Sequence, residues 1–365
     1  MSEGLRVLSS GVDTLYFSSR GKLRDGLIEA LEACRTEGGG RSLRFEFGEG
    51  GTAFVRRGYG WKGYRHWLEG PGFDVMVGVS ETFPPVYVQL RSDFIHEMGV
   101  SVALAEVVRI LVAHFFAGEF TLDLSRLDVY CDLQGWEPRP ADFERFVSRA
   151  TARTHHEIPG GEAELFGTGR RLSGFTFGRK EFVARIYEKR LQMAATGKDW
   201  QMSVWKDADP DAAVWRIEFQ ARRPVLAALE LRTAEEGVRR RQGLWDYGGK
   251  WLSLREAAGH SRVSRRPVAP VWAWVQRVQL GEPCEPLVRA RARLADERRL
   301  IAAWTGYSTS YAALQRLQRL TDTTQVLGAS AEGYLARAGR SFEGEVEHKR
   351  SLLVDRAPVG ATREA

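Results

Sequence analysis

The sequence predicts an α+β fold in which a domain built on an antiparallel or mixed sheet is followed by a smaller, helical C-terminal domain. Short segments of alternating apolar and polar residues dominate the first half, and helical segments are inserted between groups of these strands. The regular strand-helix alternation that is typical of a parallel sheet is missing, which favours antiparallel or mixed pairing. From residue 268 onward the pattern changes to helices rich in Ala, Leu and Arg.

The first strands and the first helix follow from alternation and from turn residues. Apolar residues alternate with charged ones over 43–47, and the glycine-rich stretch 48–51 leads into 53–56, so we expect a β-hairpin. Residues 86–90 follow a Pro-Pro pair and form the next expected strand. A helix is expected over 101–118, because Ser stands at its N-cap position and its apolar residues recur at helical spacing.

The next segments complete the predicted sheet domain. We expect strands at 122–133, 172–190 and 213–220, where the second has the option of a hairpin turn near Gly178, and a helix at 140–152. Pro224 is placed to open a further helix, since the first turn of a helix does not need its missing N–H.

The change in pattern places the domain boundary. We predict a sheet domain over residues 1–255 and a helical domain over 268–350, separated by a basic, loop-like stretch at 260–267. Residues 351–365 are expected to be a frayed tail.

The composition excludes several classes of protein. Of the 365 residues, 43% are hydrophobic and 27% are charged, and no apolar run is long enough to cross a bilayer. The N-terminus lacks the basic segment and apolar block of a secretory signal, so we expect a cytoplasmic protein with no membrane partner. The cysteines Cys34, Cys131 and Cys284 lie too far apart for a disulfide framework or a Cys-x-x-Cys zinc site.

The net charge indicates the kind of partner. A formal charge of +6 and a pI near 9.3 favour a polyanion, because clustered Lys and Arg displace counterions from phosphates. Many basic proteins bind no nucleic acid, so the charge by itself does not identify nucleic acid as the partner.

Strand alternation gathers a tyrosine and two cations on one side of the expected strand 181–190. Arg185, Tyr187 and Lys189 point to one face, and the apolar residues between them point to the other. Tyrosine has an ordinary pKa of about 10, so a tyrosine nucleophile needs neighbouring cations or a base. The three side chains together therefore predict a nucleophilic tyrosine.

Two further strands carry acids on their polar faces. Arg216 and Glu218 share a face in one strand, and Asp128 and Asp132 share a face in the other. The two aspartates are four residues apart, roughly 13 Å in a strand, so both cannot bind one metal ion, and we favour Asp128. If the polar faces meet in one sheet, they supply a nucleophile, carboxylates for Mg²⁺ or Mn²⁺, and cations for a phosphate. The alternative is an ordinary solvated outer face, which alternation alone also predicts.

These three strands resemble motifs of the replication initiation factor family, the rolling-circle initiators of plasmids and filamentous phages together with relaxases of integrative conjugative elements. The resemblance covers roughly residues 11–235. The motifs that carry it are Arg126-Leu-Asp-Val-Tyr-Cys-Asp132, Arg185-Ile-Tyr-Glu-Lys189 and Trp215-Arg-Ile-Glu-Phe219, with Gly11-Val-Asp-Thr-Leu-Tyr-Phe17 and Phe175-Thr-Phe-Gly178 in support.

The resemblance implies a role for each matching residue. Tyr187 would be the nucleophile, and Asp128 and Glu218 would be metal ligands. The residues that would support the phosphate are Arg185, Lys189 and Arg216. The fold would be similar to that of nickases with a His-hydrophobic-His metal motif, yet that motif is missing here. The adjacent pair His155 and His156 does not replace it, and we expect this pair on a surface loop.

Aromatic and basic residues are interleaved over 56–67, a mixture suited to stacking bases and holding phosphates of single-stranded DNA. Packing of these aromatics in the core is the open alternative. Together with the polar strand faces, this segment gives the predicted DNA-binding residues, which are Arg56, Arg57, Lys62, Tyr64, Arg126 and Arg216.

These patterns predict a DNA-nicking enzyme that begins rolling-circle replication. It would bind double-stranded and single-stranded origin DNA, cleave one strand with its tyrosine, and leave a 5′-phosphotyrosine and a free 3′-OH. A host helicase and polymerase would be its partners. The alternatives are a relaxase of a conjugative element, with the same chemistry, and a non-catalytic regulator that uses the same sheet to hold DNA.

Overall fold

A computed structural model describes residues 4–48, 52–150, 152–159, 170–197, 199–289 and 297–354. The chain divides into two compact units, Met1–Arg289 and Ala290–Ala365, and each is considered by itself.

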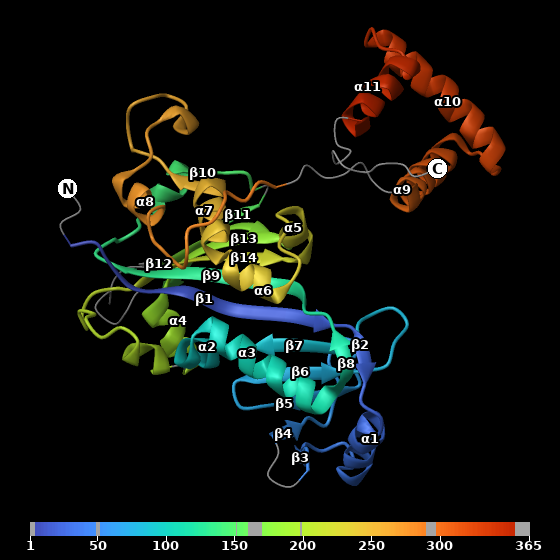
Figure 1. Cartoon of the computed structure of the whole chain (residues 1–365). Coiled ribbons are helices and arrows are strands. Elements are labelled where there is room, and N and C mark those ends of the chain that lie inside the picture. The colour runs from blue at the N-terminus through green and yellow to red at the C-terminus, as the bar shows by residue number, and fades with distance from the viewer. Residues whose placement is uncertain are drawn as a thin grey trace. The chain divides into compact units, whose positions relative to one another are not determined.

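One large antiparallel sheet organises the first unit (Figure 1). In the described part of the chain it has eleven strands in the order β11-β12-β13-β14-β9-β1-β7-β6-β5-β4-β3. Every neighbouring pair runs antiparallel, which confirms the predicted α+β fold. The strands are β1 (Arg6–Ser19), β3 (Leu43–Glu46), β4 (Ala53–Arg56), β5 (His66–Glu69), β6 (Phe73–Val77), β7 (Val86–Leu90), β9 (Asp123–Gln134), β11 (Arg153–Pro159), β12 (Arg170–Arg179), β13 (Phe182–Glu188) and β14 (Trp215–Arg222).

Two short strand pairs and a set of helices complete this unit. The pairs are β2 (Gly21–Leu23) with β8 (Phe116–Phe120), and β10 (Phe146–Ser148) with β15 (Leu252–Leu254). The α-helices are α1 (Leu27–Glu37), α2 (Ser92–Met98), α3 (Val100–Ile110), α4 (Lys189–Thr196), α5 (Arg223–Ala228), α6 (Ala234–Arg239), α7 (Arg241–Trp251) and α8 (Pro270–Val275). A π-helical turn, η1 (Leu111–Phe115), and the 3₁₀ helices η2 (Pro140–Arg145), η3 (Asp199–Ser203) and η4 (Val263–Arg265) lie between them.

Helices cover the apolar face of the sheet and leave the opposite face to polar residues. Helix α7 approaches the sheet so closely that a Cβ on Gly248 would lie 2.5 Å from the ring of Phe219. Trp245 on the same helix and Trp272 on α8 are fully buried. This packing fixes which face of β9, β13 and β14 is the core, and so leaves their other face for the polar side chains.

Several predicted elements are confirmed. The expected hairpin is β3 and β4, paired from Leu43 with Arg56 to Glu46 with Ala53. The strands expected at 86–90, 122–133 and 213–220 are β7, β9 and β14 within one or two residues. Pro224 lies in the first turn of α5, as predicted.

Two local predictions are wrong, and in both cases other contacts outweigh the local pattern. The helix expected over 140–152 is only the 3₁₀ helix η2, because the chain then turns into β10 and buries Phe146 against the rings of Phe177 and Trp272. The segment expected as strand over 172–190 does turn near Gly178, since β12 ends at Arg179 and pairs antiparallel with β13, but β13 ends at Glu188. The Glu188 carboxylate accepts hydrogen bonds from the backbone N–H groups of residues 190 and 191, both at 3.0 Å, and so starts helix α4 at Lys189.

The division between the units falls after Arg289, beyond the expected boundary at 255–268. Residues 268–289 therefore lie in the first unit. Helix α8 packs there because Trp272 is fully buried and its Nε1–H donates to the Gly249 carbonyl at 3.0 Å.

The second unit is helical, with α9 (Glu297–Gln315), α10 (Leu320–Arg337) and α11 (Phe342–Val354). The Tyr311 hydroxyl on α9 lies 2.9 Å from the Ser330 hydroxyl on α10. Part of the expected tail, 355–365, lies outside the described residues.

Within the described ranges, no single helix is long and apolar enough to cross a membrane. Helix α2 and the stretch Val100–Phe115 reach the required length and composition only as a pair, which is bent by 109°.

Candidate active site

The register of the sheet brings Tyr187 next to Glu218. Strand β13 pairs with β14 so that Arg185 stands opposite Glu218 and Tyr187 stands opposite Arg216. Directly opposed residues of an antiparallel pair share a face. The predicted convergence of the two polar strand faces is therefore present at these four positions.

One carboxylate joins the tyrosine and the arginine of β13. The Tyr187 hydroxyl donates to Glu218 Oε2 at 3.0 Å, and Arg185 Nη1 donates to Glu218 Oε1 at 3.0 Å. Glu218 is almost completely buried, whereas 37% of the Arg185 side chain is exposed. The phenol therefore has a proton acceptor in contact, and a cation lies on the other side of that acceptor.

The ionisation of Tyr187 differs from the expectation for a tyrosine flanked by cations. Burial raises the pKa of the Tyr187 phenol well above its ordinary value, and the negative charge of Glu218 raises it further. The resting phenol is therefore protonated, and Glu218 is the acceptor of its hydrogen bond.

Lys189 lies beside the tyrosine although it begins a helix. Its Nζ is 5.5 Å from the centre of the Tyr187 ring and donates to Gln192 Oε1 at 2.9 Å. Burial, followed by the charge of Arg216, lowers the pKa of Lys189 to about 8. The ammonium group therefore keeps its proton at neutral pH and loses it as the pH rises through about 8.

Tyr187 and Arg185 open onto a cavity of about 520 Å³ between β12, β13 and α4. His156 and Thr176 also line it, and His156 Nε2 lies 2.9 Å from Thr176 Oγ1. The loop expected at His155 and His156 is in fact strand β11, which places His156 on this side of the sheet. His156 and Thr176 were not identified as lining residues from the sequence, because no local sequence pattern indicates that β11 pairs with β12.

Gly174 keeps space beside the tyrosine. It stands opposite Tyr187 on β12, and a Cβ at this position would lie 2.5 Å from the Ile186 carbonyl oxygen and 3.0 Å from Tyr187 Cβ. A larger residue would push the two strands apart at the nucleophile.

Arg216 lies in a closed ion network beside the tyrosine. Its Nε donates to Asp132 Oδ1 at 2.6 Å, and its Nη1 donates to Asp13 Oδ1 at 2.6 Å. The Trp205 Nε1–H donates to Asp132 Oδ2 at 2.9 Å and covers the network from the segment between β13 and β14. Arg216 is fully buried, so the roles predicted for it in phosphate support and DNA binding are wrong: no phosphate reaches a guanidinium whose donors already bind two carboxylates.

Asp13 enters this network through a β-bulge. The register of β1 against β9 shifts between Val12 and Thr14, which leaves Asp13 as the extra residue. Burial would raise the pKa of Asp13, but the charge of Arg216 holds it below its ordinary value. Sequence reasoning missed Asp13, because a bulge breaks the alternation on which it relied.

The predicted metal ligands do not form a metal site in this arrangement. Both Asp128 oxygens accept from Arg126 Nε at 3.0 Å, and both Glu218 oxygens are bonded to Tyr187 and Arg185. Asp128 stands opposite Gln220, one position along the face from Glu218. Among the described residues there is no group of three His, Cys, Asp or Glu side chains that could hold a metal ion. In this arrangement each of the two carboxylates is therefore neutralised by an arginine.

The predicted DNA-binding residues divide into buried and exposed sets. Arg56 is fully buried, and Tyr64 is 7% exposed, so direct contact of either with DNA is contradicted. Arg57 forms an ion pair with Glu69. Lys62 is exposed, and 24% of the Arg126 side chain is exposed, so these two remain available to a phosphate.

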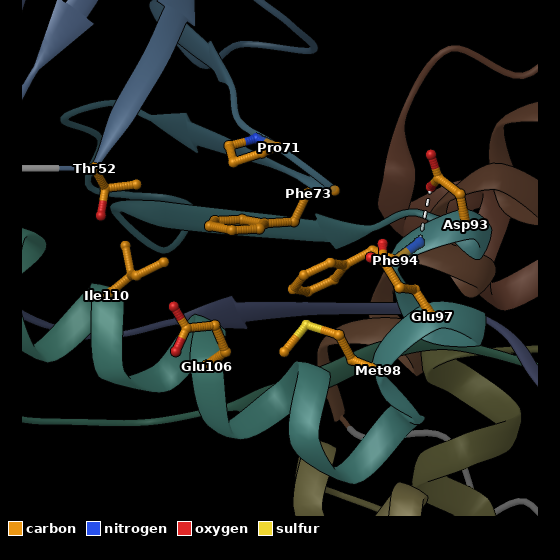
Figure 2. Close-up of a pocket in the computed structure, with 10 residues that line it drawn as sticks. Thr52, Pro71, Phe73, Asp93, Phe94, Glu97, Met98, Glu106 and Ile110 are labelled. Carbon is orange, nitrogen blue, oxygen red and sulfur yellow. Dashed lines mark hydrogen bonds between the residues drawn. The ribbon is translucent and has the colours of Figure 1, made fainter.

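A larger cavity, of about 650 Å³, lies elsewhere in the first unit (Figure 2). Its apolar part is formed by Phe73, Phe94 and Met98, and the carboxylates of Glu97 and Glu106 stand at its side (Figure 2). These carboxylates would repel a phosphate, and no tyrosine is among the described residues that line the cavity. The cavity at Tyr187 is therefore the candidate active site.

Comparison with known proteins gives one structural likeness. No family model matches the chain, and no curated protein matches it. The chain is similar to the solved structure of a rolling circle replication initiator protein from Geobacillus stearothermophilus, with a TM-score of 0.45 and 18% sequence identity over 79% of this chain and 100% of that chain.

Proposed function

We propose that this chain is a DNA-nicking initiator of rolling-circle replication whose nucleophile is Tyr187. The observation that carries the proposal is the 3.0 Å hydrogen bond from the Tyr187 hydroxyl to Glu218 at the wall of an open cavity. A nucleophile in contact with its base is the arrangement that covalent catalysis needs. Arg185 at the same cavity supplies positive charge for the phosphate.

The proposed reaction is a transesterification. Tyr187 Oη attacks the phosphorus of one DNA strand while its proton passes to Glu218. The new bond joins phosphorus to the phenolic oxygen, and the bond from phosphorus to the 3′ oxygen breaks. Lys189, which carries a proton at neutral pH, gives one to the leaving 3′ oxygen. The products are a 5′-phosphotyrosine and a free 3′-OH, and the reverse reaction rejoins the strand without ATP.

The free 3′-OH is the primer for a polymerase. We therefore propose origin DNA as the binding partner, with a host helicase and polymerase acting after the nick. Phosphate contacts by exposed cations would supply much of the affinity for DNA, so binding should weaken steeply as salt is raised. A relaxase would use the same chemistry at a transfer origin.

A metal requirement stays a prediction from the resemblance. Cleavage with Mg²⁺, with Mn²⁺ and with a chelator measures it directly. In the proposed reaction every proton moves to or from a side chain of this chain. The roles of Tyr187, Glu218 and Lys189 can therefore be tested separately from the metal requirement.

The deciding experiment is the formation of a covalent adduct. Wild-type protein is incubated with single-stranded oligonucleotides from the origin region of its own element, and a denaturant-resistant protein-DNA band is sought. Tyr187→Phe removes only the phenolic oxygen, so this variant should fold and bind the oligonucleotide but form neither nick nor adduct.

The matched control is Tyr311→Phe, which removes a phenolic oxygen from α9 in the second unit. This variant should form the adduct as the wild type does. An adduct with Tyr187→Phe would mean that another tyrosine is the nucleophile. If the wild type binds the origin but forms no adduct under any metal condition, the non-catalytic regulator is the better description.

A further inference from the structure

A cluster of three half-buried aromatic rings lies on the same face of the sheet as Tyr187. Tyr16 is on β1, Tyr87 is on β7, and Trp61 is in the loop between β4 and β5. The rings of Trp61 and Tyr87 are stacked, with centres 5.3 Å apart and planes 23° apart, and Tyr16 meets Tyr87 edge-on at 6.3 Å. Tyr16 also lines a cavity of about 530 Å³ together with Trp200, so its ring borders open space.

The register places the cluster on the same face as the nucleophile. Tyr16 stands opposite Arg126 on β9, and Arg126 stands opposite Arg222 on β14. Arg222 lies on the same face of β14 as Glu218, because the two are four residues apart. A strand of DNA that crosses β13, β14, β9 and β1 therefore stays on one face of the sheet from Tyr187 to Tyr16.

Cations line this route. Arg185 borders the Tyr187 cavity, Arg222 is exposed, and the Arg126 guanidinium lies 5.1 Å from the centre of the Tyr16 ring. Arg126 is held in place by buried Asp128, and this pairing gives Asp128 a structural task other than metal binding. The route thus offers positive charge to phosphates and rings to bases, the combination that binds single strands without sequence preference.

The Trp61 ring of the cluster is held by a tight turn between β4 and β5. Trp61 and Tyr64 exchange two backbone hydrogen bonds of 2.9 Å, and Lys62 and Gly63 between them both have positive φ, of 45° and 92°. Lys62 Nζ lies 4.5 Å from the centre of the Trp61 ring. An exposed cation-π contact is worth about 0.5–1 kcal/mol, whereas a base stacked on an aromatic side chain is worth about 1–3 kcal/mol. A base can therefore displace the lysine, which is then free to bind the adjacent phosphate.

We propose that Trp61, Tyr87 and Tyr16 form a base-stacking surface for single-stranded DNA that continues from the Tyr187 cavity. This inference rests on the proposed function for the identity of the strand. From β13 to β7 there are four strand spacings of about 4.8 Å, or about 19 Å across the sheet. Tyr187 is level with Asp132 on β9 and Tyr87 is level with Asp123, which adds about 30 Å along the strands and makes the separation about 35 Å. At about 3.4 Å per stacked nucleotide, the surface binds bases about ten nucleotides from the cleaved phosphate.

The test measures binding without cleavage. In a Tyr187→Phe background, the affinity for a single-stranded origin oligonucleotide is measured by fluorescence anisotropy, and the same origin sequence as a duplex is measured in parallel. Trp61→Leu keeps an apolar side chain against Tyr87 but removes the stacking face. We expect single-strand affinity to fall about 5- to 150-fold, which is about 1–3 kcal/mol, while duplex affinity stays the same.

Two further variants sharpen the result. Tyr59→Leu is the matched control, because Tyr59 is in the same loop and 62% exposed but packs on Trp67 outside the cluster, so its affinity should equal that of the parent. Arg222→Gln should lower the slope of log affinity against log salt by about one, as expected for one lost phosphate contact. Thermal unfolding of each variant confirms that the fold is intact.

Two outcomes would overturn the inference. One is single-strand affinity unchanged by Trp61→Leu, and the other is an equal loss for single strand and duplex. Failure of the proposed function gives a different result. In that case wild-type protein forms no adduct, while Trp61→Leu still loses single-strand affinity selectively.

Discussion

Two ion networks lie side by side on β13, β14 and β9, and they differ in their access to solvent. In the first, Glu218 joins Arg185 and Tyr187 at the wall of a cavity. In the second, Arg216 joins Asp132 in the interior and also joins Asp13, whose side chain is 18% exposed. The exposed fraction of the arginine side chain is 37% in the first network and 1% in the second.

The two networks contain the same types of residue but differ in the segments that lie over them, and this decides whether solvent can reach the arginine. Both networks consist of an arginine and acids on the polar faces of adjacent strands. Trp205, from the segment that follows α4, closes over Asp132, and the bulge at Asp13 adds a second carboxylate to Arg216. Among the described residues, Tyr187 and Arg185 border a cavity, so this network is the one that we expect a substrate to meet.

The largest effect is expected from a substitution that breaks the closed network. Removing one partner of a buried ion pair costs about 3–5 kcal/mol, because the other charges stay buried without compensation. Arg216→Ala should therefore lower the free energy of unfolding by about that amount, as measured by urea denaturation. Arg185→Ala is the comparison and should lower it by less, because Arg185 is 37% exposed and Glu218 keeps its hydrogen bond from Tyr187. Equal losses would contradict the division into a structural and a reactive network.

The second prediction breaks the open network without disturbing the fold. Glu218→Gln keeps the size of the side chain and an oxygen to accept from Tyr187 but removes the base. Cleavage of a single-stranded origin oligonucleotide should fall by about 10²–10⁴, the usual contribution of a general base, with little change in oligonucleotide affinity. Single-turnover kinetics measure this rate. Undiminished cleavage would remove Glu218 from the reaction.

The third prediction concerns the pH dependence of cleavage. Lys189 has a pKa of about 8, so its proton is lost, and cleavage should fall, as the pH rises through 8. Between pH 8 and the ordinary lysine value of 10.5 the folded protein binds fewer protons than the unfolded chain, so stability rises with pH over this range as the cost of burying the charged Lys189 is relieved. The loss of cleavage is therefore not caused by unfolding at this group.

Lys189→Arg tests this assignment, because arginine keeps its proton throughout the range. The rate of the variant at pH 9 divided by its rate at pH 7 should exceed the same ratio for the wild type by up to about tenfold. An identical alkaline fall in both proteins would assign the titration to another group.

The last prediction concerns a substitution that weakens the contact by which Trp205 covers the closed network. Trp205→Phe keeps an aromatic ring in the small cluster with Met193 and Val214 but removes the hydrogen bond to Asp132. The variant should lose about 2 kcal/mol of stability, as expected for a hydrogen bond to a charged group, and should cleave normally at low temperature. Thermal unfolding and adduct formation measure the two quantities. Slower cleavage with unchanged stability would mean that the closed network acts on the chemistry.

The amino-acid sequence by itself determined the local elements and the faces of the strands. Alternation gave β7, β9 and β14 within one or two residues and placed Tyr187 and Glu218 on polar faces. It did so because a strand points successive side chains to opposite sides whatever it pairs with. The same rule failed at Lys189, where the Glu188 carboxylate caps a helix and ends the alternation.

Only the tertiary structure decided which polar residues meet and which are covered. Glu218 reaches Tyr187, and Asp128 is held by Arg126, because of strand pairings between residues far apart in the chain. Arg216 and Glu218 are two residues apart on one strand and look equivalent in sequence, yet Arg216 binds two carboxylates in a buried network and Glu218 binds Tyr187 and Arg185, which line a cavity. The physical reason is that alternation is a property of each strand alone, whereas register, bulges and covering segments depend on the packing of the whole sheet.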